Sequence, residues 1–147
     1  MKIYEIEAKY APAFADFVPE DVLKRVGMPG YFSLGGFSQV DGELYATGFL
    51  QYYKGRRSTD RMARLTYLYV PEEERKEANA WSLLTEMHRR LKASRVRGVE
   101  LALCGAMIED MKPFFMRMGF TEPRETTPAI MLALSEVFTD KLFPRLL

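Results

Sequence analysis

Apolar residues recur along the chain with two different spacings, which divide it into strands and helices. Alternating or continuous apolar runs predict seven strands, at residues 2–8, 32–40, 43–53, 63–70, 99–104, 119 onward and 129–137. Helical spacing and end signals predict four helices, at residues 11–18, 19–26, 76–93 and 109–118. The resulting order, βααβββαβαββ, predicts an α/β (α+β) fold, a mixed sheet with helices on its faces.

The second and third predicted strands are expected to form a hairpin. Asp41-Gly42 lies between them, and this pair suits the positive φ angles of a two-residue type I′ turn. The second of the two short helices before the hairpin is delimited by Pro19 at its start and by Gly27 after its end.

Residues 65–84 connect a short apolar strand to a helix that begins with small residues. Beyond the strand, Ala80, Leu84, Met87 and Leu91 recur at helical spacing. A helix entered in this way directs unpaired backbone N–H groups, and the positive end of its dipole, beyond the carboxyl end of the strand. The junction is therefore a candidate phosphate-binding site.

Two motifs in this part of the chain resemble those of the GNAT acyl-CoA N-acyltransferases. Leu68-x-Val70, followed by Arg75-x-x-Ala78-x-Ala80, stands where the family has Leu-x-Val and then Arg/Gln-x-x-Gly-x-Gly/Ala. Further on, the run from Phe114-Phe115 to Gly119-Phe120 resembles the family's Phe-Tyr-x-x-x-Gly-Phe. The order of predicted elements is also the family's. The resemblance implies one N-acetyltransferase domain over residues 1–147, with a mostly antiparallel, seven-stranded sheet flanked by helices.

The resemblance also implies where acetyl-CoA, the co-substrate, would bind. In the family it lies between the strands that correspond to residues 63–70 and 99–104, with its pyrophosphate on the loop after the first of them. The implied cofactor-binding residues are Leu68, Tyr69, Val70, Arg75, Lys76, Glu77, Ala78, Asn79, Ala80 and Trp81. Small residues suit this loop because a bulky side chain would hold the phosphate away from the N–H groups. Ala78 replaces the family's first glycine.

The positions at which the family often carries catalytic groups hold other residues here. Thr66 and Arg64 stand where members often have Glu or His, Phe115 replaces a general-acid tyrosine, and Ile108 lies near the place of an asparagine. The catalytic residues are therefore unknown from sequence. Tyr67 and Tyr69 share one face of their strand and are interpreted, like Cys104, as packing residues.

Three functions remain open at this stage. The first is an N-acetyltransferase in which a primary amine of a small molecule or peptide attacks the thioester directly. The second is a non-catalytic module with the same fold that binds CoA or another ligand, as the residues at the usual catalytic positions suggest. The third is an unrelated α/β interaction domain, for which the motif matches would be coincidence.

Composition narrows the class of partners. The chain has 147 residues, 48% of them hydrophobic, and nearly balanced charge, with Lys plus Arg at 21 and Asp plus Glu at 20. This balance argues against a nucleic-acid partner. His88 is the only histidine, expected at a helix rim, and with one cysteine the chain lacks the ligands of a metal site.

The remaining expectations concern location and assembly. One cysteine and an N-terminus without a signal peptide favour a cytoplasmic protein. No apolar run reaches the roughly 18 residues of a membrane-spanning helix, so no membrane partner is expected. The apolar tail at residues 138–147 is expected either to fold back or to form a homodimer.

Overall fold

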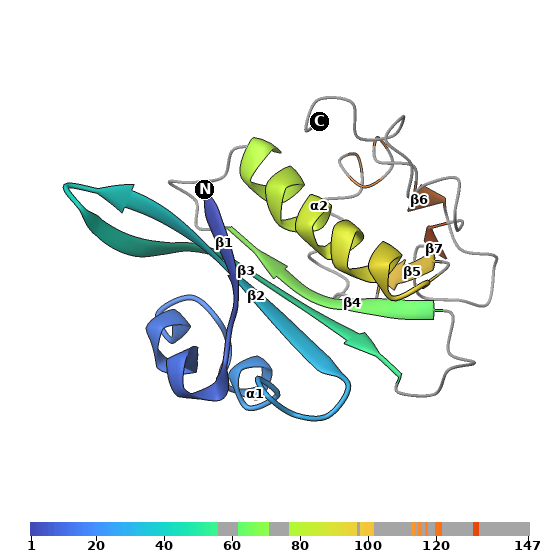
Figure 1. Cartoon of the computed structure of the whole chain (residues 1–147), viewed down its shortest axis with the longest axis horizontal. Coiled ribbons are helices and arrows are strands. Elements are labelled where there is room, and N and C mark those ends of the chain that lie inside the picture. The colour runs from blue at the N-terminus through green and yellow to red at the C-terminus, as the bar shows by residue number, and fades with distance from the viewer. Residues whose placement is uncertain are drawn as a thin grey trace.

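The computed structural model describes residues 1–55, 62–70, 77–96, 98–101, 113, 115, 117, 120–121 and 131–132. The described strands join in one sheet, in the order β1-β2-β3-β4-β5-β7-β6 (Figure 1). They are β1 (Lys2–Glu5), β2 (Tyr31–Val40), β3 (Glu43–Lys54), β4 (Met62–Tyr69), β5 (Gly98–Leu101), β6 (Phe120–Thr121) and β7 (Met131–Leu132). The helical segments are the 3₁₀ helix η1 (Ala8–Phe14), α1 (Glu20–Leu23) and α2 (Glu77–Ala93). Strands β4 and β5 pair in parallel, and all other described pairs are antiparallel.

The predicted mixed, mostly antiparallel sheet with flanking helices is confirmed. The hairpin is also confirmed, because Asp41 (φ 50°) and Gly42 (φ 84°) both take the positive φ angles of a type I′ turn. The helix predicted at residues 76–93 is α2, from Glu77 to Ala93.

The two predicted N-terminal helices are wrong in their bounds. The first is a 3₁₀ helix over Ala8–Phe14, with Pro12 inside it, and the second is a single α-helical turn over Glu20–Leu23. Pro12 has no N–H to donate and its ring crowds the preceding turn, which favours a short, tight helix over a regular one. Gly27 takes a positive φ angle of 84° and reverses the chain after the second segment, as expected for a glycine after a helix end.

Several predicted elements lie wholly or partly outside the described residues. Residues 113, 115 and 117 of the helix predicted at 109–118 are helical, but the rest of that helix and residues 102–104 of the fifth strand are not described. The apolar tail at 138–147 also lies outside the described residues. The exact order βααβββαβαββ therefore stays a prediction.

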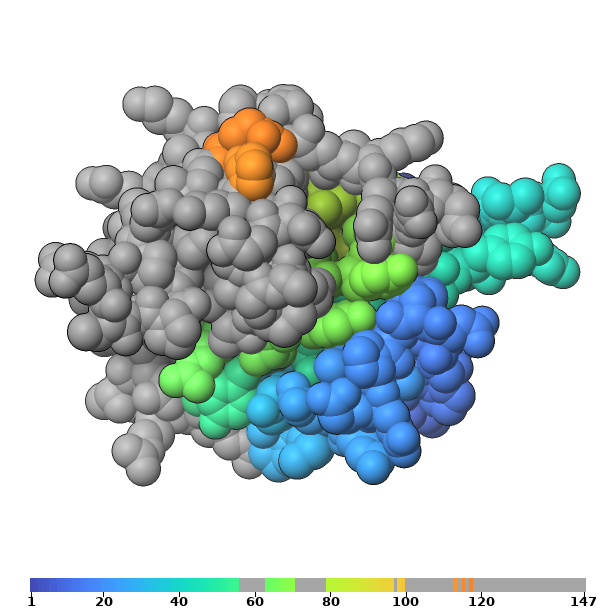
Figure 2. Space-filling view, turned by 180° about the vertical axis from the view of Figure 1, so that it is seen from behind, coloured from blue at the N-terminus to red at the C-terminus, as the bar shows by residue number. Residues whose placement is uncertain are grey.

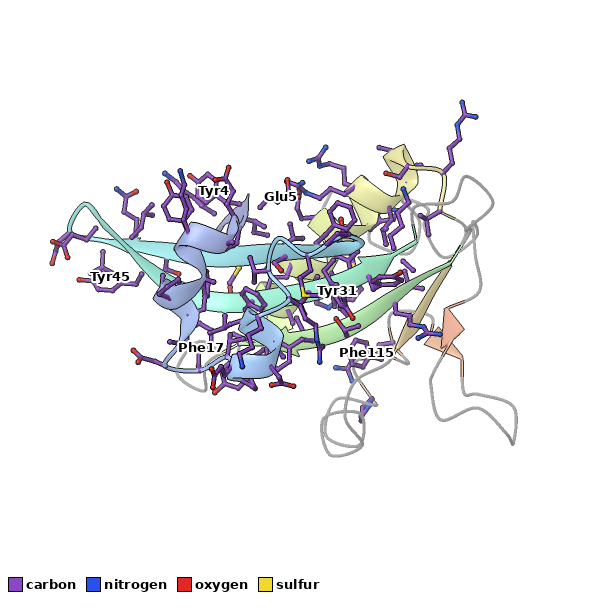
Figure 3. All side chains as sticks on the ribbon, turned by 90° about the horizontal axis from the view of Figure 1, so that it is seen from below. Tyr4, Glu5, Phe17, Tyr31, Tyr45 and Phe115 are labelled. Carbon is purple, nitrogen blue, oxygen red and sulfur yellow. The ribbon has the colours of Figure 1, made fainter. Side chains whose placement is uncertain are left out.

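The sheet separates two hydrophobic clusters. Helix α2 covers one face, and η1 with α1 covers the other; Figure 1 shows them on opposite sides of the strands, and Figure 3 shows the N-terminal segments in front of the sheet and α2 behind it. On the α2 face the largest fully buried side chains are Leu34, Leu50, Leu65, Leu68, Leu83, Leu84, Met87, Leu91 and Phe115. The opposite face is built around Phe14 and Phe49, with Ile6, Val18, Val22, Val26 and Tyr67. Burial of these apolar side chains is the main driving force for the fold.

Candidate functional site

Strand β4 changes the face that its side chains occupy at a β-bulge. Gln51 of β3 pairs with Tyr67, whereas its neighbour Tyr52 pairs with Leu65, so Thr66 is the extra residue. The Thr66 hydroxyl donates a hydrogen bond of 3.0 Å to the Gln51 carbonyl oxygen, which stabilises the bulge.

The bulge lets β4 contribute to both cores. Leu65 lies in the cluster under α2, and without the bulge Tyr67 would follow it onto that face. Instead Leu68 and Val70 lie under α2, and Tyr67 and Tyr69 belong to the opposite cluster. The predicted sharing of one face by Tyr67 and Tyr69 is confirmed.

The parallel pairing of β4 with β5 is described only before the bulge. It runs from Met62 beside Gly98 to Leu65 beside Leu101. Residues 102–104, which would continue β5, lie outside the described residues. The carboxyl-terminal half of β4, after Thr66, therefore differs from the first half in both register and facing.

The start of α2 packs directly on this second half of β4. Ala80 and Trp81 are 7% exposed and share a hydrophobic cluster with Leu68 and Val70. The first N–H groups of a helix have no acceptor within it, so the first turn of α2 directs such groups outward from its amino-terminal end. The structure thus brings the end of β4 and the beginning of α2 together, as the sequence motif predicted.

The ten predicted cofactor-binding residues fall into four groups. The side chains of Leu68, Val70, Ala80 and Trp81 are buried in the core, Asn79 and Tyr69 are half-buried, and Glu77 and Ala78 lie in the first turn of α2. Arg75 and Lys76 lie outside the described residues. The buried members could contact a ligand only through their main-chain atoms. Binding by these residues stays a prediction.

An aromatic pair covers the end of β4 on the face opposite α2. The rings of Phe17 and Tyr69 are stacked with their centroids 5.5 Å apart and an interplanar angle of 25°. The Tyr67 hydroxyl donates a hydrogen bond of 3.2 Å to the Phe17 carbonyl oxygen. Phe17, which follows η1, is thereby held over the end of β4 (Figure 3).

A buried glutamine fixes the rest of the N-terminal segment to the sheet. The Gln51 Nε2 donates to the Val22 carbonyl oxygen at 3.0 Å and to the Ser33 hydroxyl at 3.1 Å. The Gln51 side chain is fully buried, and its Oε1 has no hydrogen-bond partner among the described residues. Sequence reasoning missed both Phe17 and Gln51, although a glutamine inside the apolar run at residues 49–53 was a signal of a buried polar role.

The positions at which the family often has its catalytic acid or base were named above. Where the structure describes them, they hold residues that do not fit these roles. The Thr66 hydroxyl is engaged with the Gln51 carbonyl, Arg64 is exposed, and Phe115 is fully buried in the core under α2. Ile108 and Cys104 lie outside the described residues. Within the described ranges no group of three or more His, Cys, Asp or Glu side chains could hold a metal ion.

The expectation that His88 lies at a helix rim is wrong. His88 is 8% exposed, because it lies on the same side of α2 as Leu84 and Leu91, which pack into the core. Nearby, burial raises the pKa of Tyr52 to about 12. Hydrogen bonding by Arg89 lowers the pKa of Glu86. These shifted groups belong to the carboxyl-terminal half of α2 and the strand beneath it, not to the junction of β4 and α2.

No protein-family model and no curated protein sequence matches the chain. Solved structures do match it in fold. An acetyltransferase of the GNAT family from Staphylococcus aureus MU50 superposes with a TM-score of 0.70 at 14% identity, covering 90% of this chain and 98% of that one.

Two further structures give the same result. PaiA N-acetyltransferase from Thermoplasma acidophilum, in complex with coenzyme A, matches with a TM-score of 0.60 at 15% identity, over 88% of this chain and 96% of that one. Ribosomal-protein-alanine N-acetyltransferase from Brucella melitensis biovar Abortus 2308 matches with a TM-score of 0.61 at 17% identity, over 78% of this chain and 88% of that one. The chain therefore has the fold of the GNAT acetyltransferases.

Proposed function

We propose that the protein is an N-acyltransferase that transfers an acetyl group from acetyl-CoA to a primary amine. The observation that carries the proposal is the junction of β4 and α2. A bulged strand end there packs against the start of a 17-residue helix, within a fold shared with acetyltransferases. A helix start of this kind suits the pyrophosphate of CoA.

The replacement of the family's first glycine by Ala78 is compatible with CoA binding. Residue 78 is helical, and a helical residue needs no positive φ angle. The methyl group therefore costs no backbone strain. Since Ala80 and Trp81 are buried, the proposed contacts to the phosphates are made by main-chain N–H groups of the first turn, with Arg75 and Lys76 as proposed charged partners.

The proposed reaction is a direct displacement. The neutral amine nitrogen attacks the thioester carbon, an amide C–N bond forms, and the C–S bond breaks. The nitrogen releases a proton, and the CoA thiolate takes one up. Main-chain N–H groups near Leu68 to Val70 are proposed to stabilise the negative charge that develops on the acyl oxygen. We propose that solvent takes up the proton from the nitrogen and supplies the one that the thiolate receives.

The second candidate is a module that binds CoA without transferring its acyl group. The engaged hydroxyl of Thr66 and the buried, hydroxyl-free side chain of Phe115 favour it. Release of CoA thiol from acetyl-CoA, measured with a panel of primary amines and free-amine peptides, separates the two. Amine-dependent release together with a mass increase of the acceptor supports the enzyme. Tight binding of acetyl-CoA without release with any acceptor would favour the module.

The composition of the chain supports a proposal for the location and the partners of the protein. We place the protein in the cytoplasm, with an amine acceptor as its partner and neither nucleic acid nor membrane. No helix in the described part of the chain is both long and apolar enough to span a bilayer. A homodimer formed through the tail at residues 138–147 stays a prediction.

A further inference from the structure

The hairpin of β2 and β3 extends beyond the rest of the sheet as a two-stranded arm, residues 38–47. Among the described strands, β1 pairs with β2 only up to Phe37, and β4 pairs with β3 only from Phe49 onward. Figures 1 and 2 show the arm projecting from the side of the molecule. A two-stranded hairpin without further contacts is only marginally stable in water, so a partner that covers the arm would stabilise it.

One face of the arm combines apolar side chains with a carboxylate. Successive residues of a strand alternate between faces, and Phe37, which pairs with Ala46, packs with the cluster under η1 and α1. Val40, Glu43 and Tyr45 therefore share the other face. Val40 and Tyr45 are 54% and 50% exposed, and the Tyr45 hydroxyl donates a hydrogen bond of 3.1 Å to a Glu43 carboxylate oxygen. The tip of the arm thus presents an aromatic ring and a negative charge side by side.

A small hollow lies at the opposite end of the same two strands. It has a volume of about 210 Å³ and is lined by residues 27–32 and 54–55. Tyr31 and Phe32 contribute aromatic surface to this lining, and Lys54 contributes a cation. Sites for small molecules usually have volumes of about 300 Å³ or more, so the size of the hollow suits a single inserted side chain.

The lining of the hollow is held in place by close packing. Gly30 has a φ angle of 86°, and a Cβ atom at this position would lie 2.5 Å from the Tyr53 ring, so a larger residue does not fit. The Lys54 N–H donates a hydrogen bond of 2.8 Å to the Gly30 carbonyl oxygen, and the rings of Tyr31 and Tyr53 contact each other with centroids 5.0 Å apart. A hollow that is formed in advance lowers the cost of binding a partner.

The two ends of the hairpin carry opposite charges. Asp41 and Glu43, at the tip, are the only charged residues from position 26 to position 53. At the other end Lys54 lines the hollow, and none of the residues that line it is acidic. The negative tip and the positive hollow are therefore electrostatically complementary.

The tip of the arm cannot reach the hollow of its own chain. Tyr31 pairs with Tyr53 at one end of the hairpin, and Val40 pairs with Glu43 at the other. The ten residues of β2 span about 30 Å at about 3.3 Å per residue. Figure 1 shows the tip of the arm and the loop into β2 at opposite ends of these strands. A contact between tip and hollow therefore requires two copies of the chain.

We propose that copies of the protein associate head to tail, with the arm tip of one copy inserted into the hollow at residues 27–32 and 54–55 of the next. Tyr45 fills the hollow against its aromatic lining, and Glu43 pairs with Lys54 of the partner subunit. The two surfaces differ, so the contact is heterologous, and its repetition builds a closed ring or an open chain. This inference does not depend on the proposed transferase function.

The test reverses one charge at each end of the hairpin. Glu43→Lys and Lys54→Glu are made singly and together in one chain, and Tyr45→Ala removes the ring. Glu7→Lys, at an exposed residue outside both surfaces, is the control for a reversed charge. Sedimentation velocity measures the association of each protein from micromolar to millimolar concentration, at low and at high salt.

The wild type and Glu7→Lys should associate with increasing concentration, and less at high salt. Glu43→Lys and Lys54→Glu should each weaken association by about tenfold or more, because each places like charges at the contact. Tyr45→Ala should weaken it by about tenfold through loss of the aromatic anchor. The double variant, and an equal mixture of the two single variants, should recover association, since both restore opposite charges at the contact.

Three results would overturn the proposal. The first is a wild type that stays monomeric at millimolar concentration. The second is association that neither charge reversal weakens, which would assign it to another surface such as the tail at residues 138–147. The third is a loss in both single variants without recovery in the double variant or the mixture, which would refute the pairing of Glu43 with Lys54.

Discussion

Helix α2 covers one face of the sheet over the larger of the two hydrophobic clusters, whereas the N-terminal segment covers the other face over a smaller cluster that includes buried hydrogen bonds. Under α2, a continuous cluster runs from Leu34 to Phe115. On the other face, Gln51 and Tyr67 donate from the sheet to carbonyl oxygens of Val22 and Phe17. Apolar packing is non-directional, whereas each hydrogen bond depends on a single geometry.

This difference predicts that the two covers differ in how readily they open. A cofactor site built at the start of α2 is held by a large core and is expected to be rigid. The cover on the opposite face consists of short helical segments over a smaller hydrophobic cluster with a few buried hydrogen bonds, so it is expected to open locally at lower cost. The predictions below test this contrast.

The largest effect is expected from the core under α2. Leu84→Ala removes a side chain that is 1% exposed and should lower the free energy of unfolding by about 2–5 kcal/mol. Urea denaturation of the purified protein measures the change. Leu44→Ala, at a residue 49% exposed on the arm, is the matched control and should change stability by less than about 0.5 kcal/mol. Equal effects of the two substitutions would contradict the assignment of the core.

A smaller and more local effect is expected on the opposite face. Gln51→Leu keeps the volume but leaves the Val22 carbonyl without the Gln51 donor, and should cost about 1–3 kcal/mol. Amide hydrogen exchange should accelerate at residues 19–26 more than in α2.

The control for this change is Gln39→Leu, at an exposed glutamine of the arm, which should leave both measurements unchanged. If Gln51→Leu accelerated exchange equally in α2 and at residues 19–26, the two faces would unfold together and the contrast would fail.

The smallest effect is expected from the ion pairs at the outer side of α2. Glu86 lies 2.6 Å from Arg89 and 3.0 Å from Arg90. Hydrogen bonding by Arg89 lowers the pKa of Glu86 from 4.5, so its stabilisation is present above about pH 4.5 and is lost as the pH falls through the folded-state pKa. Glu86→Gln should therefore cost about 0.2–1 kcal/mol at neutral pH and nothing at low pH.

Unfolding free energies at a series of pH values check this dependence, with Glu7→Gln, in an exposed pair, as control. A pH-independent loss in Glu86→Gln would show that the carboxylate charge is not what stabilises this side of the helix.

The parts of the fold that were predictable from sequence depend on local signals. The hairpin follows from Asp41-Gly42 and the helix α2 from the spacing of Ala80, Leu84 and Leu91, and neither requires knowledge of distant contacts. The N-terminal helices were placed less well, because Pro12 converts a predicted regular helix into a 3₁₀ segment.

The elements of the candidate site were predictable from sequence, but their contacts were not. The motif predicted a strand followed by a helix, and these are β4 and α2; binding at their junction stays a prediction. The bulge at Thr66 puts Leu65 and Leu68 on one face of the sheet. It depends on the register with β3 and could not be predicted from the order of apolar and polar residues along the strand. The roles of Phe17 and Gln51 likewise depend on contacts between segments distant in sequence.

The central claim is that the junction of β4 and α2 binds the phosphates of CoA, and calorimetric titration of acetyl-CoA into the wild type and Asn79→Asp tests it most directly. The carboxylate introduced at position 79 would repel the pyrophosphate. Because it would lie in the first turn of α2, where a negative charge interacts favourably with the helix dipole, the substitution should not weaken the fold. Ser94→Asp, beyond the other end of the helix, is the control with the same change in charge. We expect an approximately micromolar Kd for the wild type and Ser94→Asp, and a Kd weaker by about tenfold or more for Asn79→Asp. Equal affinity in all three proteins, or no binding by the wild type at millimolar ligand, would contradict the claim.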